Sequence, residues 1–131
     1  MIKKILYYWL PLLLWCYLIF FLSGIPNLRT NLPGAWDLVL RKIAHMIEYA
    51  VLYVLAFRAL SNDFAEYGKR KLVISAAVFA LLYACTDEIH QSYVPTRGPS
   101  FYDVLIDSVG IMIGYTAYNF ALEKGFFKNA L

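Results

Sequence analysis

Acidic, imidazole and amide side chains occur in three stretches of an otherwise apolar sequence. These side chains and their neighbours are His45 and Glu48, then Asp87, Glu88, His90 and Gln91, and then Arg97, Ser100, Asp103 and Asp107. Carboxylates and imidazoles serve as general acids and bases or bind Mg²⁺, Mn²⁺ or Zn²⁺. An arginine in a loop binds phosphate or carboxylate through two parallel hydrogen bonds. The spacing does not choose between these chemistries, because H-E-x-x-H, a Ser-His-Asp order and a Gly-rich phosphate loop are all missing.

One helical face carries the third stretch. Its small and acidic residues are three or four positions apart, which places them in a single stripe. The stripe consists of Ser100, Asp103, Asp107, Gly110, Gly114, Ala117 and Ala121. Gly110 and Gly114 predict close packing against another helix, within the chain rather than between two copies. Ser100 and Asp103 form S-x-x-D, so we expect Ser100 to cap the helix. Asp107 lies about 10 Å further along, where an unpaired acid costs roughly 2.5 to 3.5 kcal/mol in lipid.

Four apolar segments must position these residues. The chain has 131 residues, of which 61% are apolar and 16% charged, with a mean hydropathy of +0.57. Membrane spans are predicted over residues 5–23, 41–60, 72–93 and 101–122, with a kink near Pro11. The first segment exceeds the apolar region of a signal peptide, so we interpret it as a span. Polarity varies along these segments rather than around them, which a bilayer imposes and a soluble amphipathic bundle does not. We therefore predict one all-α domain over residues 1–131, a polytopic four-transmembrane-helix bundle with short loops.

The basic residues predict the orientation of this bundle. Seven lie on the side of the amino terminus, and they are Lys3, Lys4, Lys69, Arg70, Lys71, Lys124 and Lys128. Four lie on the other side, and they are Arg29, Arg41, Lys42 and Arg97. The positive-inside rule places both termini in the cytoplasm, so the polar residues gather in a pocket that opens outward. We interpret Arg41 and Lys42 as reaching lipid phosphates, although Lys42 also offers a cation to the acids. The net charge of +3 is spread out, which argues against nucleic-acid binding.

Two motifs resemble the VanZ-like family. They are residues 42–49 (KIAHMIEY) and residues 87–97 (DEIHQSYVPTR), the latter followed by the stripe from Ser100 to Gly114. Thr96 departs from the pattern, where the family more often has Gly. The resemblance implies a small bacterial integral membrane protein of the plasma membrane, whose namesake is associated with teicoplanin resistance, and it implies no known reaction. The motif positions that carry over are Lys42, His45, Tyr49, Asp87, Glu88, Gln91, Arg97, Ser100 and Asp103.

These observations leave three hypotheses. The one we favour is a pocket that binds or modulates a lipid-linked or glycopeptide-related anion of the cell envelope, in contact with membrane lipids. Its candidate ligand-binding residues are Lys42, His45, Glu48, Tyr49, Asp87, Glu88, His90, Gln91, Arg97, Ser100, Asp103 and Asp107. The alternative is a metal-assisted hydrolase or transferase acting on a lipid-linked phosphate or sugar. Its candidate catalytic or metal-binding residues are His45, Asp87, Glu88 and Asp107. The third is a purely structural polar network, so enzyme activity and a divalent metal cofactor both stay open.

Overall fold

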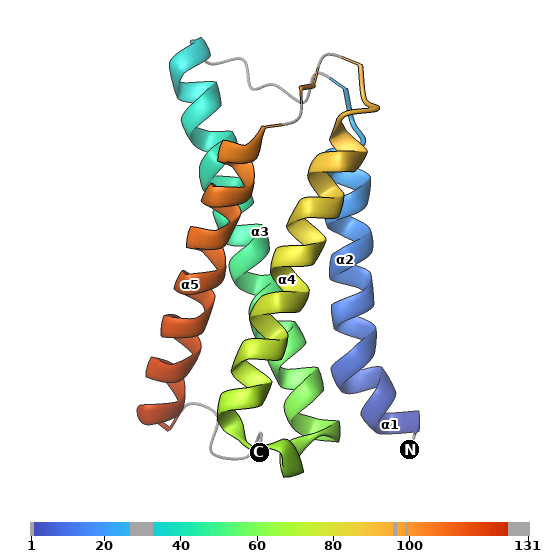
Figure 1. Cartoon of the computed structure of the whole chain (residues 1–131), viewed down its shortest axis with the longest axis vertical. Coiled ribbons are helices and arrows are strands. Elements are labelled where there is room, and N and C mark those ends of the chain that lie inside the picture. The colour runs from blue at the N-terminus through green and yellow to red at the C-terminus, as the bar shows by residue number, and fades with distance from the viewer. Residues whose placement is uncertain (1, 27–32, 96, 99, 126–131) are drawn as a thin grey trace.

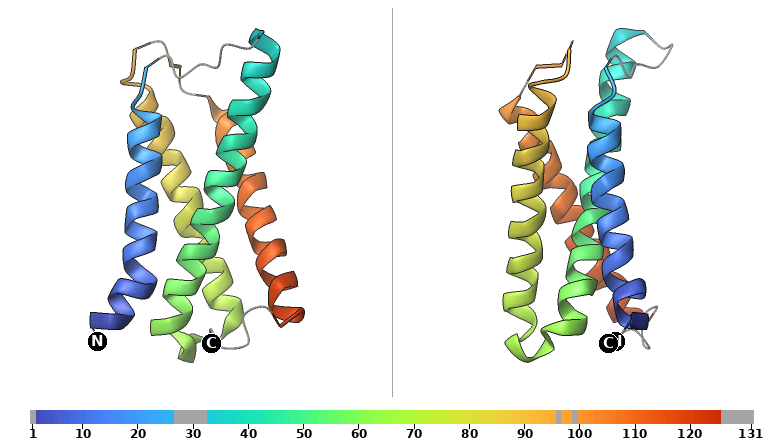
Figure 2. Two further views of the ribbon diagram at one scale, coloured as in Figure 1. Left: turned by 180° about the vertical axis from the view of Figure 1, so that it is seen from behind. Right: turned by 90° about the vertical axis from the view of Figure 1, so that its right-hand side faces the viewer.

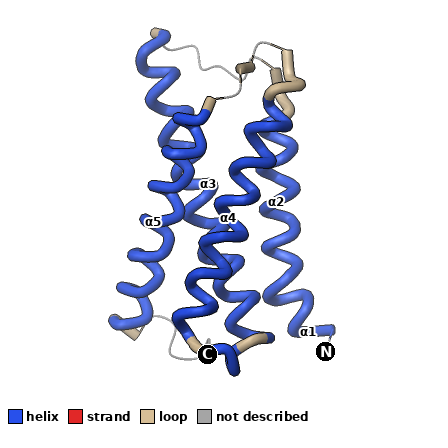
Figure 3. The backbone as a smooth tube through the Cα atoms, viewed as in Figure 1, coloured by secondary structure: helices blue, strands red, loops and turns tan. Residues whose placement is uncertain are grey.

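The computed structural model describes residues 2–26, 33–95, 97–98 and 100–125. In these ranges the chain forms helices and no strand (Figures 1 and 3). Four helical runs are long and apolar enough to cross a membrane: Ile2–Ser23, Gly34–Asp63, Lys69–Gln91 and Phe101–Glu123. The prediction of an all-α bundle with four spans is therefore confirmed. Large apolar side chains such as Leu13 and Leu14 are 61% and 58% exposed, as a lipid-facing surface requires.

The first span changes helical type directly before Pro11. It consists of α1 (Ile2–Lys4), the π-helical segment η1 (Ile5–Trp9) and α2 (Leu10–Ser23). The backbone N–H of Leu10 bonds to the carbonyl of Ile5, five residues back. Proline has no N–H to donate, so the regular hydrogen-bond ladder is interrupted here. The chain bends at this place, where the sequence predicts a kink (Figure 1).

The second span, α3 (Gly34–Asp63), is the central helix and packs against α2, α4 and α5. Its fully buried side chains include Tyr49, Leu52 and Tyr53. The helix begins seven residues before the predicted start at residue 41. Its 30 residues extend about 45 Å, which exceeds a hydrocarbon core of about 30 Å. The mixed charged and apolar residues of this extension hid it from a hydropathy argument, and its amino-terminal end projects beyond the neighbouring helices (Figure 2).

The third span, α4 (Lys69–Gln91), begins three residues before and ends two residues before its predicted bounds. Ala76, Ala80 and Ala84 recur every four residues and are all 0% exposed, so small side chains let α4 approach its neighbours. The short connection from α3 contains the 3-10 segment η2 (Ala65–Tyr67) and Gly68. Gly68 has φ +82°, a left-handed conformation that glycine adopts without strain.

The fourth span, α5 (Phe101–Glu123), lies directly against α3 through two glycines. A Cβ atom added to Gly110 would lie 2.8 Å from Cα of Met46, and one added to Gly114 would lie 3.0 Å from Cα of Ala50. The predicted stripe of small residues is wrong beyond this point, because Ala117 is exposed and Tyr118 is buried. The buried positions 107, 111, 114 and 118 follow the 3.6-residue helical period, which strict steps of three and four had approximated.

Candidate functional site

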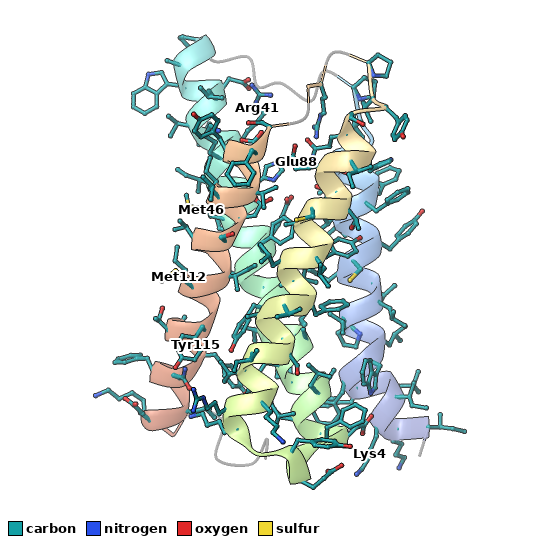
Figure 4. All side chains as sticks on the ribbon, viewed as in Figure 1. Lys4, Arg41, Met46, Glu88, Met112 and Tyr115 are labelled. Atoms are coloured by element: carbon teal, nitrogen blue, oxygen red, sulfur yellow. The ribbon has the colours of Figure 1, made fainter. Side chains whose placement is uncertain are left out.

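A cavity of about 210 Å³ opens among all four spans at the end of the bundle opposite α1. Six of the nominated residues line it: Lys42, His45, Glu48, Gln91, Arg97 and Asp103. Seven further residues line it that the sequence did not nominate: Leu22, Ser23, Leu38, Arg41, Ala44, Gly98 and Ile106. Arg41 and Glu88 both lie at this end, whereas Lys4 lies at the other (Figure 4). The polar residues of three spans thus converge at one end of the molecule.

Three basic side chains line the cavity. Nε of Arg41 is 3.1 Å from Oδ2 of Asp37, one helical turn earlier in α3. Nζ of Lys42 donates to Oδ1 of Asp103 in α5 at 2.8 Å. Arg97, in the connection between α4 and α5, has no hydrogen bond or ion pair to any residue that the structure describes.

The interpretation of Arg41 and Lys42 as side chains that reach lipid phosphates needs correction, because both line the cavity. The amino-terminal extension of α3 makes them interior positions of a helix rather than its first residues. An available signal for this extension was the spacing of Asp37 and Arg41, which is that of a helical ion pair.

His45 and Asp107 form a pair between α3 and α5. Nδ1 of His45 lies 3.3 Å from Oδ1 of Asp107. This distance is that of an ion pair, but the nitrogen is not aligned as a hydrogen-bond donor, and both oxygens of Asp107 lack hydrogen-bond partners among the described residues. The side chain of Asp107 is 1% exposed and that of His45 is 24% exposed. The imidazole therefore reaches the cavity, and the carboxylate lies behind it.

Tyr49 lies one turn beyond His45 on the same face of α3 and is 0% exposed. Its hydroxyl has no hydrogen-bond partner in the described part of the chain. Tyr49 does not line the cavity, so its polar atom is enclosed in the bundle next to the His45–Asp107 level.

The acids of α4 make separate contacts. Asp87 is 5% exposed, and its Oδ2 accepts a hydrogen bond at 2.8 Å from Nε2 of Gln91, which lines the cavity. Oε2 of Glu88 accepts the backbone N–H of Ser100 at 2.8 Å. Ser100 does occupy the residue before α5, but its hydroxyl makes no capping bond. The capping prediction for Ser100 is therefore wrong, because the side chain of Glu88 from another helix satisfies that end of α5.

His90 faces away from the cavity and toward α2. Its ring stacks on Phe20 with centroids 4.2 Å apart, and its Nδ1 lies 3.1 Å from Oγ of Ser23. The broad polar face expected for α4 is thus divided, with Gln91 at the cavity and His90 against the first span.

The candidate metal ligands do not converge. Among the residues that the structure describes, no three His, Cys, Asp or Glu side chains are arranged to hold a metal ion. Asp87 and Glu88 are engaged with Gln91 and Ser100, as described above. Thr96, and the basic residues Arg29 and Lys128 that entered the orientation count, lie outside the described residues.

Comparison with known proteins agrees with the resemblance seen in the sequence. The model of the family described as VanZ/LLP1 matches residues 8–122. This match includes most of the first span, all of the next two, every cavity residue and nearly all of α5. Neither a curated protein nor a solved structure matches the chain. Four helices able to span a membrane and a family match over most of its length show that the chain is a multi-pass membrane protein belonging to the VanZ/LLP1 family.

Proposed function

We propose that the cavity binds the phosphate of an anionic lipid or of a lipid-linked envelope component. The observation that carries this proposal is the guanidinium of Arg97, which lines the cavity without a carboxylate partner among the described residues. Arg41 and Lys42 line the same cavity, so three basic residues face two acidic ones, Glu48 and Asp103. Guanidinium groups match the geometry of phosphate oxygens, and the attraction grows where water is scarce.

The size of the cavity favours a headgroup as the ligand. Sites for drug-sized molecules usually enclose about 300 to 1,000 Å³, and this cavity encloses about 210 Å³. A phosphate headgroup fits such a space better than a whole glycopeptide does. The acyl or polyprenyl chain of the ligand would remain in the surrounding lipid.

The charge distribution supports an outward-facing site. The described basic residues at the opposite end from the cavity include Lys3, Lys4 and the cluster 69–71. The positive-inside rule assigns that end, and both termini, to the cytoplasm of a bacterial plasma membrane. In this orientation the cavity meets the outer leaflet, where lipid-linked wall precursors are used.

A binding assay with matched variants tests this proposal. Purified full-length protein in lipid nanodiscs is titrated with dioleoyl phosphatidate, and dioleoyl phosphatidylcholine serves as the zwitterionic control. Charge-assisted hydrogen bonds contribute roughly 1.5 to 3 kcal/mol, so we expect Arg97→Gln to weaken phosphatidate binding about 10- to 150-fold. Arg70→Gln, at the opposite end of α4, should leave the affinity unchanged. Equal affinity for the two lipids, or equal losses in the two variants, would refute the proposal.

Teicoplanin resistance is a further consequence that we propose from the family resemblance. If the ligand is a lipid-linked wall component, its capture alters what a glycopeptide meets at the membrane. Expression of the chain in a teicoplanin-sensitive bacterium should then raise the inhibitory concentration, and Arg97→Gln should abolish the increase. An increase that survives Arg97→Gln would separate resistance from the cavity.

A further inference from the structure

The pair formed by His45 and Asp107 is a feature that anion binding does not require. Asp107 is 1% exposed and sits in a membrane-spanning helix, where an acid is costly. The packing of α5 on α3 does not depend on it, because Gly110 and Gly114 already bring the two backbones together. The placement of a buried carboxylate here therefore calls for another explanation.

Comparison with the other pair between α3 and α5 makes the difference clear. Lys42 and Asp103 form a well-aligned hydrogen bond at 2.8 Å, and their side chains are 36% and 32% exposed. In the His45–Asp107 pair the carboxylate is enclosed and the imidazole alone reaches the cavity. Since Nδ1 faces Asp107, Nε2 is the nitrogen left for a ligand or a water molecule. A carboxylate that orients an imidazole in this way makes it a positioned general base.

We propose that His45, oriented by Asp107, hydrolyses the phosphate monoester of a lipid held by Arg41, Lys42 and Arg97. This inference rests on the proposed function, because the cations must first bind the phosphate in the cavity that His45 also lines. The substrate class is a lipid phosphate monoester. The products are the lipid alcohol and inorganic phosphate.

The residues of the cavity balance each step of this reaction. Nε2 of His45 takes a proton from water while the water oxygen bonds to phosphorus. The bond between phosphorus and the lipid oxygen breaks, its electron pair goes to that oxygen, and the neutral carboxyl of Glu48 supplies the proton. Glu48 also lines the cavity, one turn from His45 along α3. The imidazolium then returns its proton to the Glu48 carboxylate, and Asp107 stabilises the imidazolium while it lasts.

The experiment measures inorganic phosphate released by the purified full-length protein in nanodiscs from dioleoyl phosphatidate and from polyprenyl phosphate, with EDTA present. Positioned general bases contribute about 100- to 10,000-fold to a rate, so His45→Gln should lower release at least 100-fold and retain phosphatidate binding. His90→Gln is the matched control, because this imidazole lies outside the cavity, and it should stay within about twofold of the parent. Asp107 is a positioning residue, so Asp107→Asn should lower kcat and leave KM unchanged. Added imidazole should restore part of the activity of His45→Gly.

Each other outcome overturns a defined part of the inference. Binding of phosphatidate without phosphate release refutes the hydrolysis and leaves the proposed binding function intact, whereas absence of binding refutes both. Release that EDTA abolishes refutes a step carried by side chains alone. Release that His45→Gln does not change refutes the role of His45, as does equal loss in His90→Gln. Equal kcat/KM for water-soluble p-nitrophenyl phosphate refutes the lipid as the substrate.

Discussion

Substitution of Gly110 by alanine tests how α5 is held against α3. The added Cβ atom would lie 2.8 Å from Cα of Met46 and closer still to the carbonyl oxygen of that residue. Ordinary contact begins at 3.4 Å, so α5 must move outward by the difference of 0.6 Å. Both obstructing atoms belong to the backbone of α3 and no side chain can turn aside. Overpacking of this kind costs roughly 1 to 3 kcal/mol.

The expected result is a lower melting temperature in detergent. At about 3 to 4 °C per kcal/mol for a chain of this length, Gly110→Ala should melt about 3 to 12 °C below the parent protein. Gly34→Ala is the matched control, because a Cβ atom at Gly34 meets nothing within 4 Å. Asp107 is one turn from Gly110, so the same movement should open its 3.3 Å contact with His45.

Two results would contradict this reasoning. An unchanged melting temperature for Gly110→Ala would mean that α5 does not depend on the close approach. A change of oligomeric state in light scattering, without loss of stability of the single chain, would assign the glycines to an interface between copies instead.

Three further predictions follow from other contacts. Asp103→Asn breaks a half-exposed ion pair worth about 0 to 1 kcal/mol, so the melting temperature should fall only slightly, while phosphatidate affinity should rise because Lys42 is released; lower affinity would contradict the cationic cavity. Glu88→Ala removes the acceptor at the start of α5, so hydrogen exchange should quicken in that first turn, whereas Glu88→Gln retains an acceptor oxygen and should exchange slowly; equal exchange in both would refute this cap. In intact cells, a membrane-impermeant maleimide should label Gly34→Cys but not Tyr67→Cys in a chain without its natural cysteines, and the reverse pattern would invert the proposed orientation.

The spans were predictable because hydropathy is a local property. A run of apolar residues must lie in lipid whatever its neighbours are, so the helices were found without knowledge of the packing. The start of α3 was missed for the same reason. Residues 34–40 mix Asp37 with exposed apolar residues such as Trp36, and only the continued helix shows that they extend the span.

Part of the candidate site was also predictable from helical spacing. His45 and Glu48 lie three residues apart in α3 and both line the cavity, as one shared helical face predicts. Asp107 was singled out by its depth, and it is the acid that lies behind His45. In each case the argument needed only one helix and the direction of the membrane.

Partners across helices were beyond the sequence. Helical period places Glu88 and His90 only to within a broad face of α4, yet one bonds to the start of α5 and the other stacks on α2. Arg41 was read as a lipid contact, although it lines the cavity. Periodicity fixes the angle of a residue around its own axis and does not fix the rotation or height of the next helix.

The sequence by itself determined four membrane-spanning helices, a polar end and an apolar end, and the family to which the chain belongs. Only the tertiary structure decided which polar groups meet. The contact of Gly110 and Gly114 with the backbone of α3 sets the height at which Asp107 faces His45. That height depends on the interlocking of two surfaces, because in lipid helices associate through packing rather than through hydropathy.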